Sequence, residues 1–369
     1  MRERKGRFDY FLMATVTLLI FWGVIILVSI SFPLSQERFG HPGFYLLRHL
    51  LGLSFGFLLG LAALKTPLSL IKKRTPIFLL VNLFLMLLVF TPKIGITLGG
   101  ATRWINLGII SFQPSEFLKL TFILYLAAWL EARTEKTKKT APPAYITAAA
   151  FFLILCLLGL FLIFQPDIST LAVIIFTSTL MYFSAGPPFR YFLMIFLAEI
   201  GALIGLMKTA SYRFQRLLVF LKPEIDPMGL SYQAKQALMT IGAGGIWGVG
   251  LGTSIQKFFL PQPMTDSVFA VFSEEAGLVG GLTLIILFLL FAWKGYRVAQ
   301  KSKNKFYKLT AVGITSWIVL QAFVNIGAMA GMLPLTGIPL PFISYGGTAL
   351  AAELTGIGIL LNISRQINV

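Results

Sequence analysis

The stretch "YFLMATVTLLIFWGVIILVSISF", residues 10 to 32, runs for 23 residues without a charged side chain. A helix needs about 20 mainly apolar residues to cross the hydrocarbon core of a bilayer, so this stretch is long enough to span one. The basic segment "MRERKGR" (1 to 7) precedes it, as in a secretory signal peptide. The apolar run is too long for a signal, however, and no small-x-small cleavage site follows it. We therefore expect it to remain as a membrane helix.

Apolar stretches of this kind recur along the entire chain. Hydrophobic residues make up 57% of the 369 and charged residues only 12%, whereas charged residues are about 25% of a typical soluble domain. The sequence predicts an all-α polytopic membrane protein, a single integral membrane domain over residues 1–369 with no separate soluble module. The ten expected spans lie near residues 11–31, 45–64, 77–91, 114–130, 143–164, 168–183, 190–207, 268–293, 310–331 and 346–363.

Two of the breaks between these spans depend on helix-breaking residues. "FQPDIST" (164 to 170) and "AGPP" (185 to 188) interrupt an almost continuous apolar stretch with proline and glycine. If either pair of spans merged, the two termini would fall on opposite sides of the membrane.

The basic residues orient the spans. With the N-terminus inside, 20 of the 31 lysines and arginines fall in inner segments, including the dense loops "KTPLSLIKKR", "EARTEKTKK" and "KGYRVAQKSKNKFYK". Because cytoplasmic loops carry the excess of positive charge, both termini are assigned to the cytoplasm. This topology and anionic headgroups also account for most of the net charge of +17, so nucleic acid is an unnecessary partner.

Cysteine and histidine are too scarce for metal or disulfide chemistry. Cys156 is the single cysteine and lies in an apolar span, which rules out a disulfide within the chain. His41 and His49 lie far in sequence from any acidic cluster, so we expect no structural metal.

The topology places a long loop, residues 208 to about 267, between the seventh and eighth spans on the outer side of the membrane. Loops of more than about 15 residues tend to be functional. Within it, "RFQRLLVFL" sets Arg213 and Arg216 on one helical face, as in a helix that lies in the headgroup layer. Simple anchoring of that helix to lipid phosphates explains the pattern equally well.

The glycine run "GAGGIWGVGLG" (242 to 252) resembles a nucleotide loop only superficially. Trp247 stands where the dinucleotide fingerprint requires glycine, and no Gly-Lys-Ser/Thr follows. Close helix packing or a tight turn beneath a substrate is the better interpretation.

Ionisable residues in or near the spans are candidates for a polar cavity, because a charge in hydrocarbon is costly. Lys119 lies in the fourth span and Asp167 at the outer end of the fifth, and a salt bridge between them is the simplest expectation. Arg48 and Arg103 add positive charge near the same outer surface. They could bind a phosphate-bearing substrate through forked contacts, or extend to lipid headgroups.

Asp266, in "PMTDSVFAVF" (263 to 272), is the most informative acidic residue of the outer loop. Thr265 or Asp266 could cap the eighth span, where an oxygen satisfies open amides and a negative charge suits the helix dipole. A carboxylate at the outer boundary, opposite an arginine-rich face, is also what a general base for an external lipid-linked substrate would look like.

Several segments together resemble the SEDS family, whose members include the FtsW, RodA and SpoVE proteins. They are "GGATRWINLGIISFQPSEFLKL", "FQPDIST", "YRFQRLLVFLKPEIDPMGLSYQAKQAL", "GAGGIWGVGLGTSIQKFFLPQPMTDSVFAVFSEEAGLVGG" and "GMLPLTGIPLPFISYGGTALAAELTGIGILLNISR". They occur in the family's order and cover well over a third of the chain. Ten spans with both termini inside is the family's topology.

The resemblance implies a peptidoglycan glycosyltransferase (a hexosyltransferase) in the bacterial inner membrane. It would polymerise lipid II on the outer face during division or cell-wall growth, in complex with a class B penicillin-binding protein (a transpeptidase) and divisome or elongasome proteins. The family's catalytic aspartate falls on Asp266. The residues expected to bind the substrate and its pyrophosphate are Arg48, Arg103, Arg213, Arg216, Lys119, Ser344 and Tyr345, and a divalent cation such as Mg²⁺ or Mn²⁺ could assist.

Departures from the family pattern and rival functions complete these expectations. Met264 stands where members commonly have histidine before the Thr-Asp pair, which excludes a histidine base there. "QPDIST" replaces the usual Leu-Gly after "QPD", and "PFISYGG" with "NISR" favours the FtsW and SpoVE side of the family. The alternatives are a lipid II flippase, which has no clear need for an outer carboxylate, and a scaffold for a penicillin-binding protein.

Overall fold

The computed structural model describes residues 6–98, 101–106, 108, 111–134, 143–208, 211–222 and 229–367. Its helices are α1 (Tyr10–Phe39), α2 (Phe44–Lys65), α3 (Leu68–Leu88), α4 (Pro114–Thr134), α5 (Ala144–Phe164), α6 (Ile168–Ser184), α7 (Phe189–Lys208), α8 (Ser211–Leu221), α9 (Leu230–Ala243), α10 (Val268–Lys301), α11 (Lys305–Met329) and α12 (Gly347–Gln366). The strands are β1 (Gly95–Leu98), β2 (Ala101–Asn106) and β3 (Ser111–Phe112).

Each of the ten predicted spans overlaps a helix, namely α1 to α7 and α10 to α12, although α3 begins nine residues before the span predicted at 77–91. Among the described residues, seven helices are long and apolar enough to cross a membrane by themselves. Of the remaining three, α3 carries Lys72, Lys73 and Arg74 near its start, α4 carries Glu116 and Lys119, and α6 has only 17 residues. The polytopic helical membrane fold is confirmed, and ten crossings stays a prediction.

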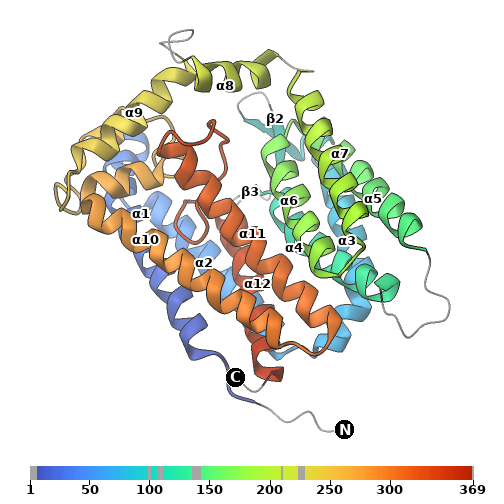
Figure 1. Cartoon of the computed structure of the whole chain (residues 1–369). Coiled ribbons are helices and arrows are strands. Elements are labelled where there is room, and N and C mark those ends of the chain that lie inside the picture. Colours follow the sequence, from blue (N-terminus) through green and yellow to red (C-terminus); the bar gives the residue numbers. More distant parts are fainter. Residues whose placement is uncertain are drawn as a thin grey trace.

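The helices form one bundle with two chemically different ends (Figure 1). α1 begins and α12 ends at the same end of the bundle, where the Asp9 backbone N–H donates to Ser364 Oγ at 3.3 Å. Lys294 Nζ lies 3.4 Å from Asp9 Oδ2 at this end, and Lys305 Nζ donates to the carbonyl of Thr134 at 3.1 Å. Lys294 and Lys305 therefore lie at the end where α1 begins and α12 ends, while α8 and α9 cross the opposite end.

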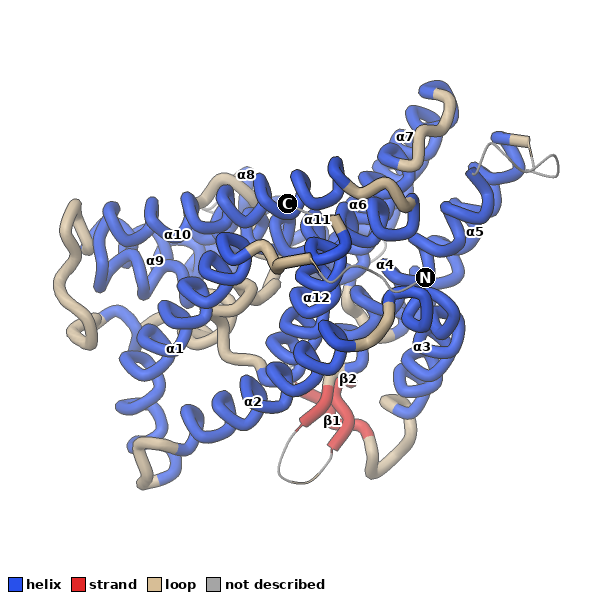
Figure 2. Tube along the Cα trace, turned by 90° about the horizontal axis from the view of Figure 1, so that it is seen from below, coloured by secondary structure: helices blue, strands red, loops and turns tan. Residues whose placement is uncertain are grey.

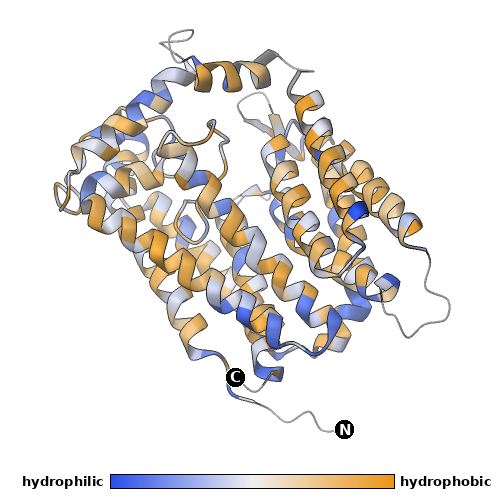
Figure 3. Cartoon of the chain, viewed as in Figure 1, coloured by the Kyte–Doolittle hydropathy of each residue, from blue (hydrophilic) through white to orange (hydrophobic). Residues whose placement is uncertain are grey.

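The outward faces of the bundle are apolar, as expected for lipid contact. Figure 3 shows hydrophobic residues along the helix sides and hydrophilic ones mainly towards the helix ends. Leu80 and Phe164 are 65% and 73% exposed on such faces, a degree of apolar exposure that soluble monomers rarely show over contiguous surfaces.

α2 and α12 pack against each other with almost no space between their backbones. The α2 sequence "GLSFGFLLG" places Gly52, Gly56 and Gly60 on one face. A Cβ at Gly52 would lie 2.4 Å from the Cα of Gly347, and one at Gly358 would lie 2.1 Å from the Gly60 carbonyl oxygen. Small residues let membrane helices approach this closely, and the contact fixes the segment that precedes α12.

The glycine run of the outer loop packs against a break in α10. Gly277 interrupts the helix with φ 68°, and the Leu278 N–H donates to the Gly245 carbonyl at 2.9 Å. The Val249 N–H donates to the carbonyl of Glu274 at 3.0 Å, and a Cβ at Gly248 would lie 2.2 Å from the Glu275 carbonyl oxygen. The close-packing interpretation of this run is confirmed, and the break exchanges backbone hydrogen bonds with the loop.

A small antiparallel sheet, which the sequence did not predict, lies between α3 and α4. β1 pairs with β2 (Gly95 opposite Ile105), and β2 pairs with β3 (Ile105 opposite Phe112). Figure 2 shows β1 and β2 at one edge of the helices, and α5 and α7 extending at another. The sheet corrects the expectation of a purely helical chain. It also holds the backbone of Arg103, in β2, in a rigid position.

Candidate active site

Asp266 lies in the turn immediately before α10, but its side chain does not cap that helix. Ser267 occupies the N-cap position. The backbone of Asp266 is held from the other direction, because Asn325 Nδ2 of α11 donates to its carbonyl at 2.8 Å and to the Ile338 carbonyl at 2.7 Å. Within the described part of the chain, no hydrogen bond to the Asp266 carboxylate is formed. The carboxylate is therefore available for chemistry.

The surroundings of Asp266 tune its acidity. Burial raises the pKa of Asp266 to about 6, and the positive charges of Arg216 and Arg103 oppose that rise. The residue is half-buried and stays accessible to a substrate. A general base works best when its pKa lies near the operating pH, so this carboxylate suits proton abstraction better than an ordinary aspartate.

Arg216 reaches the site from α8 and contacts the loop that precedes α12. Its Nη1 donates to the carbonyls of Leu335 and Thr336 at 3.4 and 3.3 Å. The next residue, Gly337, lies against the carboxylate, since a Cβ there would be 3.4 Å from Asp266 Oδ2. A helix is thus present around residues 213 to 220 as α8, and it directs Arg216 towards Asp266. Its location in the headgroup layer stays a prediction.

Arg103 reaches the same site from β2. Its Nε donates to the Gln165 carbonyl at 3.1 Å, and its Nη2 donates to the Pro166 carbonyl. Its Nη1 lies 3.9 Å from Asp167 Oδ1, and Asp167 also accepts the Thr170 N–H that begins α6. The "FQPDIST" break therefore holds the Arg103 side chain in place, and the positive charge of Arg103 acts on Asp266.

The expected salt bridge between Lys119 and Asp167 is wrong. Lys119 Nζ lies 2.8 Å from Glu116 Oε2, one turn away on α4, and donates to Gln321 Oε1 at 2.9 Å. Asp167 instead accepts the Ser115 hydroxyl at 3.2 Å and pairs with Arg103. Each charge is satisfied by a partner nearer to it, which is the cheaper arrangement for buried ions.

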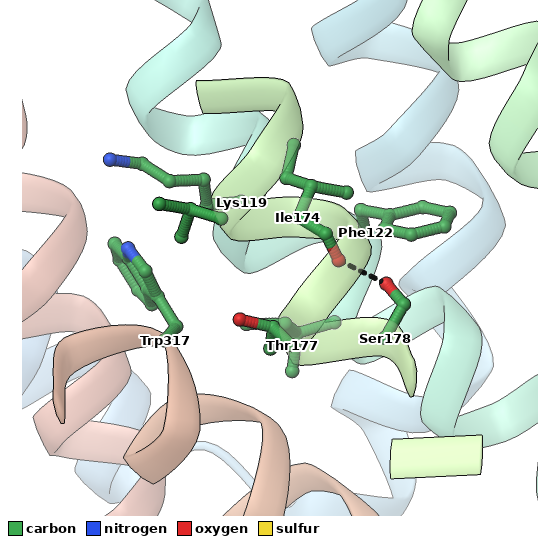
Figure 4. A pocket seen from close by; sticks show the side chains of 8 residues that line it. Lys119, Phe122, Ile174, Thr177, Ser178 and Trp317 are labelled. Atoms are coloured by element: carbon green, nitrogen blue, oxygen red, sulfur yellow. Dashed lines mark hydrogen bonds between the residues drawn. The ribbon is translucent and has the colours of Figure 1, made fainter. Parts of the chain in front are cut away.

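Lys119 lines a narrow cavity between α4, α6 and α11 that is too tight to admit a water molecule. Figure 4 shows its side chain above Trp317, whose ring centroid lies 5.4 Å from Nζ, with Thr177 and Ser178 across the cavity. Gln321 links this cavity to the site, because its Nε2 donates to the Pro339 carbonyl at 3.1 Å. Lys119 thus acts on the loop before α12 through Gln321, and no contact with Asp266 is formed.

The segment "PFISYGG" (341 to 347) fastens the Asp266 turn. Ser344 Oγ donates to the Thr265 carbonyl at 2.6 Å and accepts the Leu340 N–H at 2.7 Å. The Tyr345 N–H donates to the Met264 carbonyl at 2.8 Å. The Ser344 hydroxyl is committed to these two bonds, so the residue is better suited to positioning Asp266 than to holding a substrate.

Arg48 lies on the α2 side of this segment. Its guanidinium stacks over the Phe44 ring at 4.5 Å. Burial raises the pKa of Tyr345, and the charge of Arg48 opposes that rise, which places the two side chains close together. Arg48 therefore lies beside Tyr345, whereas Arg103 and Arg216 lie beside Asp266.

One expected site residue cannot be placed, and others went unpredicted. Arg213 belongs to α8, but its side chain lies outside the described residues. Sequence reasoning missed Asn325 and Gly337, which hold and border Asp266. Asn325 could have been noticed as a lone amide inside the apolar run "AFVNIGAM", since such groups are rarely left unpaired in a membrane.

Among the described residues, the groups around Asp266 do not form a binding site for a divalent ion. The nearby charged groups are two arginines, and within the described chain no three histidine, cysteine, aspartate or glutamate residues come together. Hard cations such as Mg²⁺ require several oxygen ligands. We therefore assign no step to a metal.

Comparison with known proteins agrees with this architecture. The family model for FtsW, RodA and SpoVE, described as "Cell cycle protein", matches residues 9–369. Stage V sporulation protein E of Bacillus subtilis is 36% identical over 370 residues, which cover 99% of both chains. A probable peptidoglycan glycosyltransferase FtsW of Coxiella burnetii is 37% identical over 97% of this chain and 96% of its own. Both relatives are of the FtsW and SpoVE kind that "PFISYGG" and "NISR" indicated.

Solved structures share the fold. A chain described under "Structural coordination of polymerization and crosslinking by a peptidoglycan synthase complex" aligns with TM-score 0.79 and 27% identity, covering 97% of this chain and 98% of its own. The rod shape determining protein RodA of Thermus thermophilus aligns with TM-score 0.70 and 26% identity, covering 98% and 97%. The chain therefore belongs to the FtsW/RodA/SpoVE family of cell cycle proteins.

Proposed function

We propose that this chain is a peptidoglycan glycosyltransferase that polymerises lipid II on the outer face of the cytoplasmic membrane, with Asp266 as its general base. The relatives that carry the name peptidoglycan glycosyltransferase match it over nearly their whole length. The single observation that carries the mechanism is the environment of the Asp266 carboxylate. The carboxylate caps no helix, its pKa is raised, and two arginines lie near it.

The proposed reaction requires a general base. The 4-hydroxyl of one N-acetylglucosamine must attack the anomeric carbon of an N-acetylmuramic acid that carries a lipid pyrophosphate. A sugar hydroxyl is a poor nucleophile, so Asp266 accepts its proton as the new bond forms. A single displacement inverts the α-linked donor to a β-linked product and needs no covalent intermediate.

The departing pyrophosphate develops negative charge, which the site can neutralise. Arg103 and Arg216 are close enough to lower the pKa of Asp266, and arginine forms forked contacts with phosphate oxygens. Preorganised cations of this kind stabilise charge that appears only in the transition state. Their backbone partners, the carbonyls at 165, 166, 335 and 336, hold both side chains before the substrate arrives.

A class B penicillin-binding protein is the partner we propose. The structurally similar chain belongs to a peptidoglycan synthase complex that coordinates polymerization and crosslinking. A polymerase that shares the membrane with a transpeptidase would supply it directly with new glycan. The growth stage, division or elongation, would follow from the identity of that partner.

The experiment that tests the function separates synthesis from transport. Purified chain in detergent, alone and with its cognate penicillin-binding protein, is given labelled lipid II, and the products are separated on a glycan-length gel. Ladders of polymer support the polymerase. Their absence in both conditions, together with lipid II crossing vesicles that contain the chain, would instead favour the flippase. Partner binding with neither activity would leave the scaffold.

A further inference from the structure

A groove on the α1 side of the Asp266 turn has no role in the mechanism above. It is lined by Leu34 and Arg38 from the end of α1 and by the turn from Lys257 to Thr265. Its volume of about 370 Å³ lies at the lower end of the roughly 300 to 1,000 Å³ of ligand-binding pockets. Arg103 and Arg216 come from β2 and α8 and do not line it, so the turn before α10 separates two different cationic surfaces.

Hydrogen bonds hold the turn that forms the wall of the groove in a defined shape. Ser267 Oγ donates to the Pro261 carbonyl at 2.9 Å, and Thr265 Oγ1 donates to Gln262 Oε1 at 3.0 Å. Gln262 itself adopts φ 50°, a conformation that costs a non-glycine residue free energy and that clusters at functional sites. The turn therefore keeps a defined shape up to Thr265, the residue before Asp266.

Arg38 is the cation that the groove offers to a ligand. Its side chain is exposed, and in the described chain its polar partner is the Tyr45 hydroxyl at 3.2 Å, with no acidic group in an ion pair. The Tyr45 ring lies 5.5 Å from the Tyr345 ring, and the backbone N–H of Tyr345 donates to the Met264 carbonyl. Arg38 is thus oriented by aromatic residues that connect it to the Asp266 turn.

The remaining lining is suited to a lipid. Leu34 and Met264 are partly buried and apolar, and Phe258 is 53% exposed. Lys257 is committed elsewhere, because its Nζ donates to the Ser29 and Gly252 carbonyls at 3.2 and 3.0 Å. One available guanidinium beside an apolar wall fits an amphiphile whose phosphate lies next to a long hydrocarbon chain.

We infer that this groove is the acceptor subsite, where Arg38 binds the phosphate of a second lipid-linked disaccharide whose 4-hydroxyl reaches Asp266. The inference rests on the proposed polymerase function, because joining two lipid-linked molecules requires two subsites on either side of one base. The donor occupies the Arg103 and Arg216 side. The acceptor O4 bonds to the donor anomeric carbon, its proton goes to Asp266, and the bond to pyrophosphate breaks with its electron pair.

Binding stoichiometry tests the subsite without requiring catalysis. Native mass spectrometry of the full chain with lipid II should show up to two bound molecules, and Arg38→Gln should show one. Arg38→Lys should restore the second, and Lys222→Gln, which removes an exposed charge after α8, should keep both. If native protein binds two and Arg38→Gln binds one but no glycan forms, the polymerase proposal falls, and the groove stands as a second lipid II site without an acceptor role. If glycan forms while Arg38→Gln still binds two, the groove proposal falls.

A kinetic test identifies which substrate the groove holds. The donor is a lipid II blocked at its 4-hydroxyl, and the acceptor is either lipid-linked or a phosphate-free disaccharide. Arg38→Gln should raise the KM for the lipid-linked acceptor by about tenfold, the loss expected for a charge-assisted contact. The KM values for the donor and for the phosphate-free acceptor should not change. A raised KM for the donor, or an unchanged KM for the lipid-linked acceptor, would overturn the assignment.

Discussion

At the scale of single residues, Asp266 shows how a turn can prepare a base. Its backbone is held by Asn325 and its neighbours are fastened by Ser344 and Tyr345, so all the fixed bonds avoid the carboxylate. The side chain is left half-buried, which raises its pKa, and Arg216 and Arg103 limit that rise. The turn thus holds the carboxylate in place and leaves its oxygens open to a substrate hydroxyl.

This balance predicts the pH dependence of the reaction. The pKa of Asp266 is raised to about 6, and only the deprotonated base is active. Polymerisation should therefore rise with pH through about 6 and level off above it. Because Arg216 lowers that pKa, Arg216→Gln should move the midpoint to higher pH, whereas Lys222→Gln should leave it in place. Rate profiles of the three proteins check this, and a midpoint that moves down or stays fixed in Arg216→Gln would contradict it.

The residue scale also shows what the sequence could reveal about the site. Asp266, Arg103 and Arg216 could be singled out because charged residues at the outer boundary of an apolar chain are few. Their proximity could not be derived, because Arg103 comes from a sheet and Arg216 from a helix more than 100 residues later. The Lys119 partner was mistaken since the choice between Glu116 and Asp167 depends on side-chain reach in the folded bundle.

The corrected pairing gives a test by double-mutant cycles. Lys119→Met and Glu116→Gln remove the two halves of a buried contact of 2.8 Å, so their effects on unfolding free energy should be non-additive by roughly 0.5 to 3 kcal/mol. Lys119→Met with Asp167→Asn should be additive within about 0.5 kcal/mol. Unfolding in mixed micelles measures both cycles. A larger coupling for the second pair would restore the original expectation.

At the scale of elements, the positions of the helices could be predicted from the apolar runs, but the break within α10 and the sheet between α3 and α4 could not. Hydropathy and two helix-breaking segments located the ten helices that overlap the predicted spans, and the charged face of "RFQRLLVFL" located α8. The break at Gly277 went unforeseen because the sequence predicts one continuous span over residues 268–293, and the break is formed with the remote loop around Gly245 and Gly248. The three-strand sheet went unforeseen because its strands are only 2 to 6 residues long.

The contact of α2 with α12 makes a prediction at this scale. A Cβ at Gly56 would lie 2.8 Å from the Cα of Ala351, so Gly56→Val must push the helices apart and should cost about 1 to 3 kcal/mol. Gly201→Ala in α7 is the matched control, because a Cβ there meets nothing within 4 Å. Thermal melting of the two variants should show a lower Tm only for Gly56→Val, and equal Tm values would argue against the close α2 packing.

At the scale of the whole molecule, the fold separates a basic end from a reactive end. α1 begins and α12 ends at one end of the bundle, and α8 and α9 cross the opposite end. Because Arg216 of α8 acts on Asp266, the Asp266 turn belongs to the α8 end. The proposed function requires the α8 and α9 end to face outside the cytoplasm, because a lipid-linked precursor must be used there if its polymer forms the wall. The positive-inside rule predicts the same orientation.

This orientation is open to chemical labelling. In a Cys156→Ser background, Lys222→Cys lies beyond α8 and Lys303→Cys lies between α10 and α11, both at exposed positions. A membrane-impermeant maleimide applied to intact cells should label the cysteine at 222 and spare the one at 303 until the cells are opened. The reverse pattern would invert the topology and remove the active site from the outer face.

The central claim is that Asp266 performs the chemistry, and one comparison tests it most directly. Labelled lipid II is given to native protein and to Asp266→Asn at equal concentration, with lipid II binding and Tm measured on the same samples. We expect the native chain to form glycan ladders and Asp266→Asn to lose at least about 100-fold in rate while it still binds lipid II and melts no earlier. Ladders of undiminished intensity from a folded Asp266→Asn would show that the base lies elsewhere.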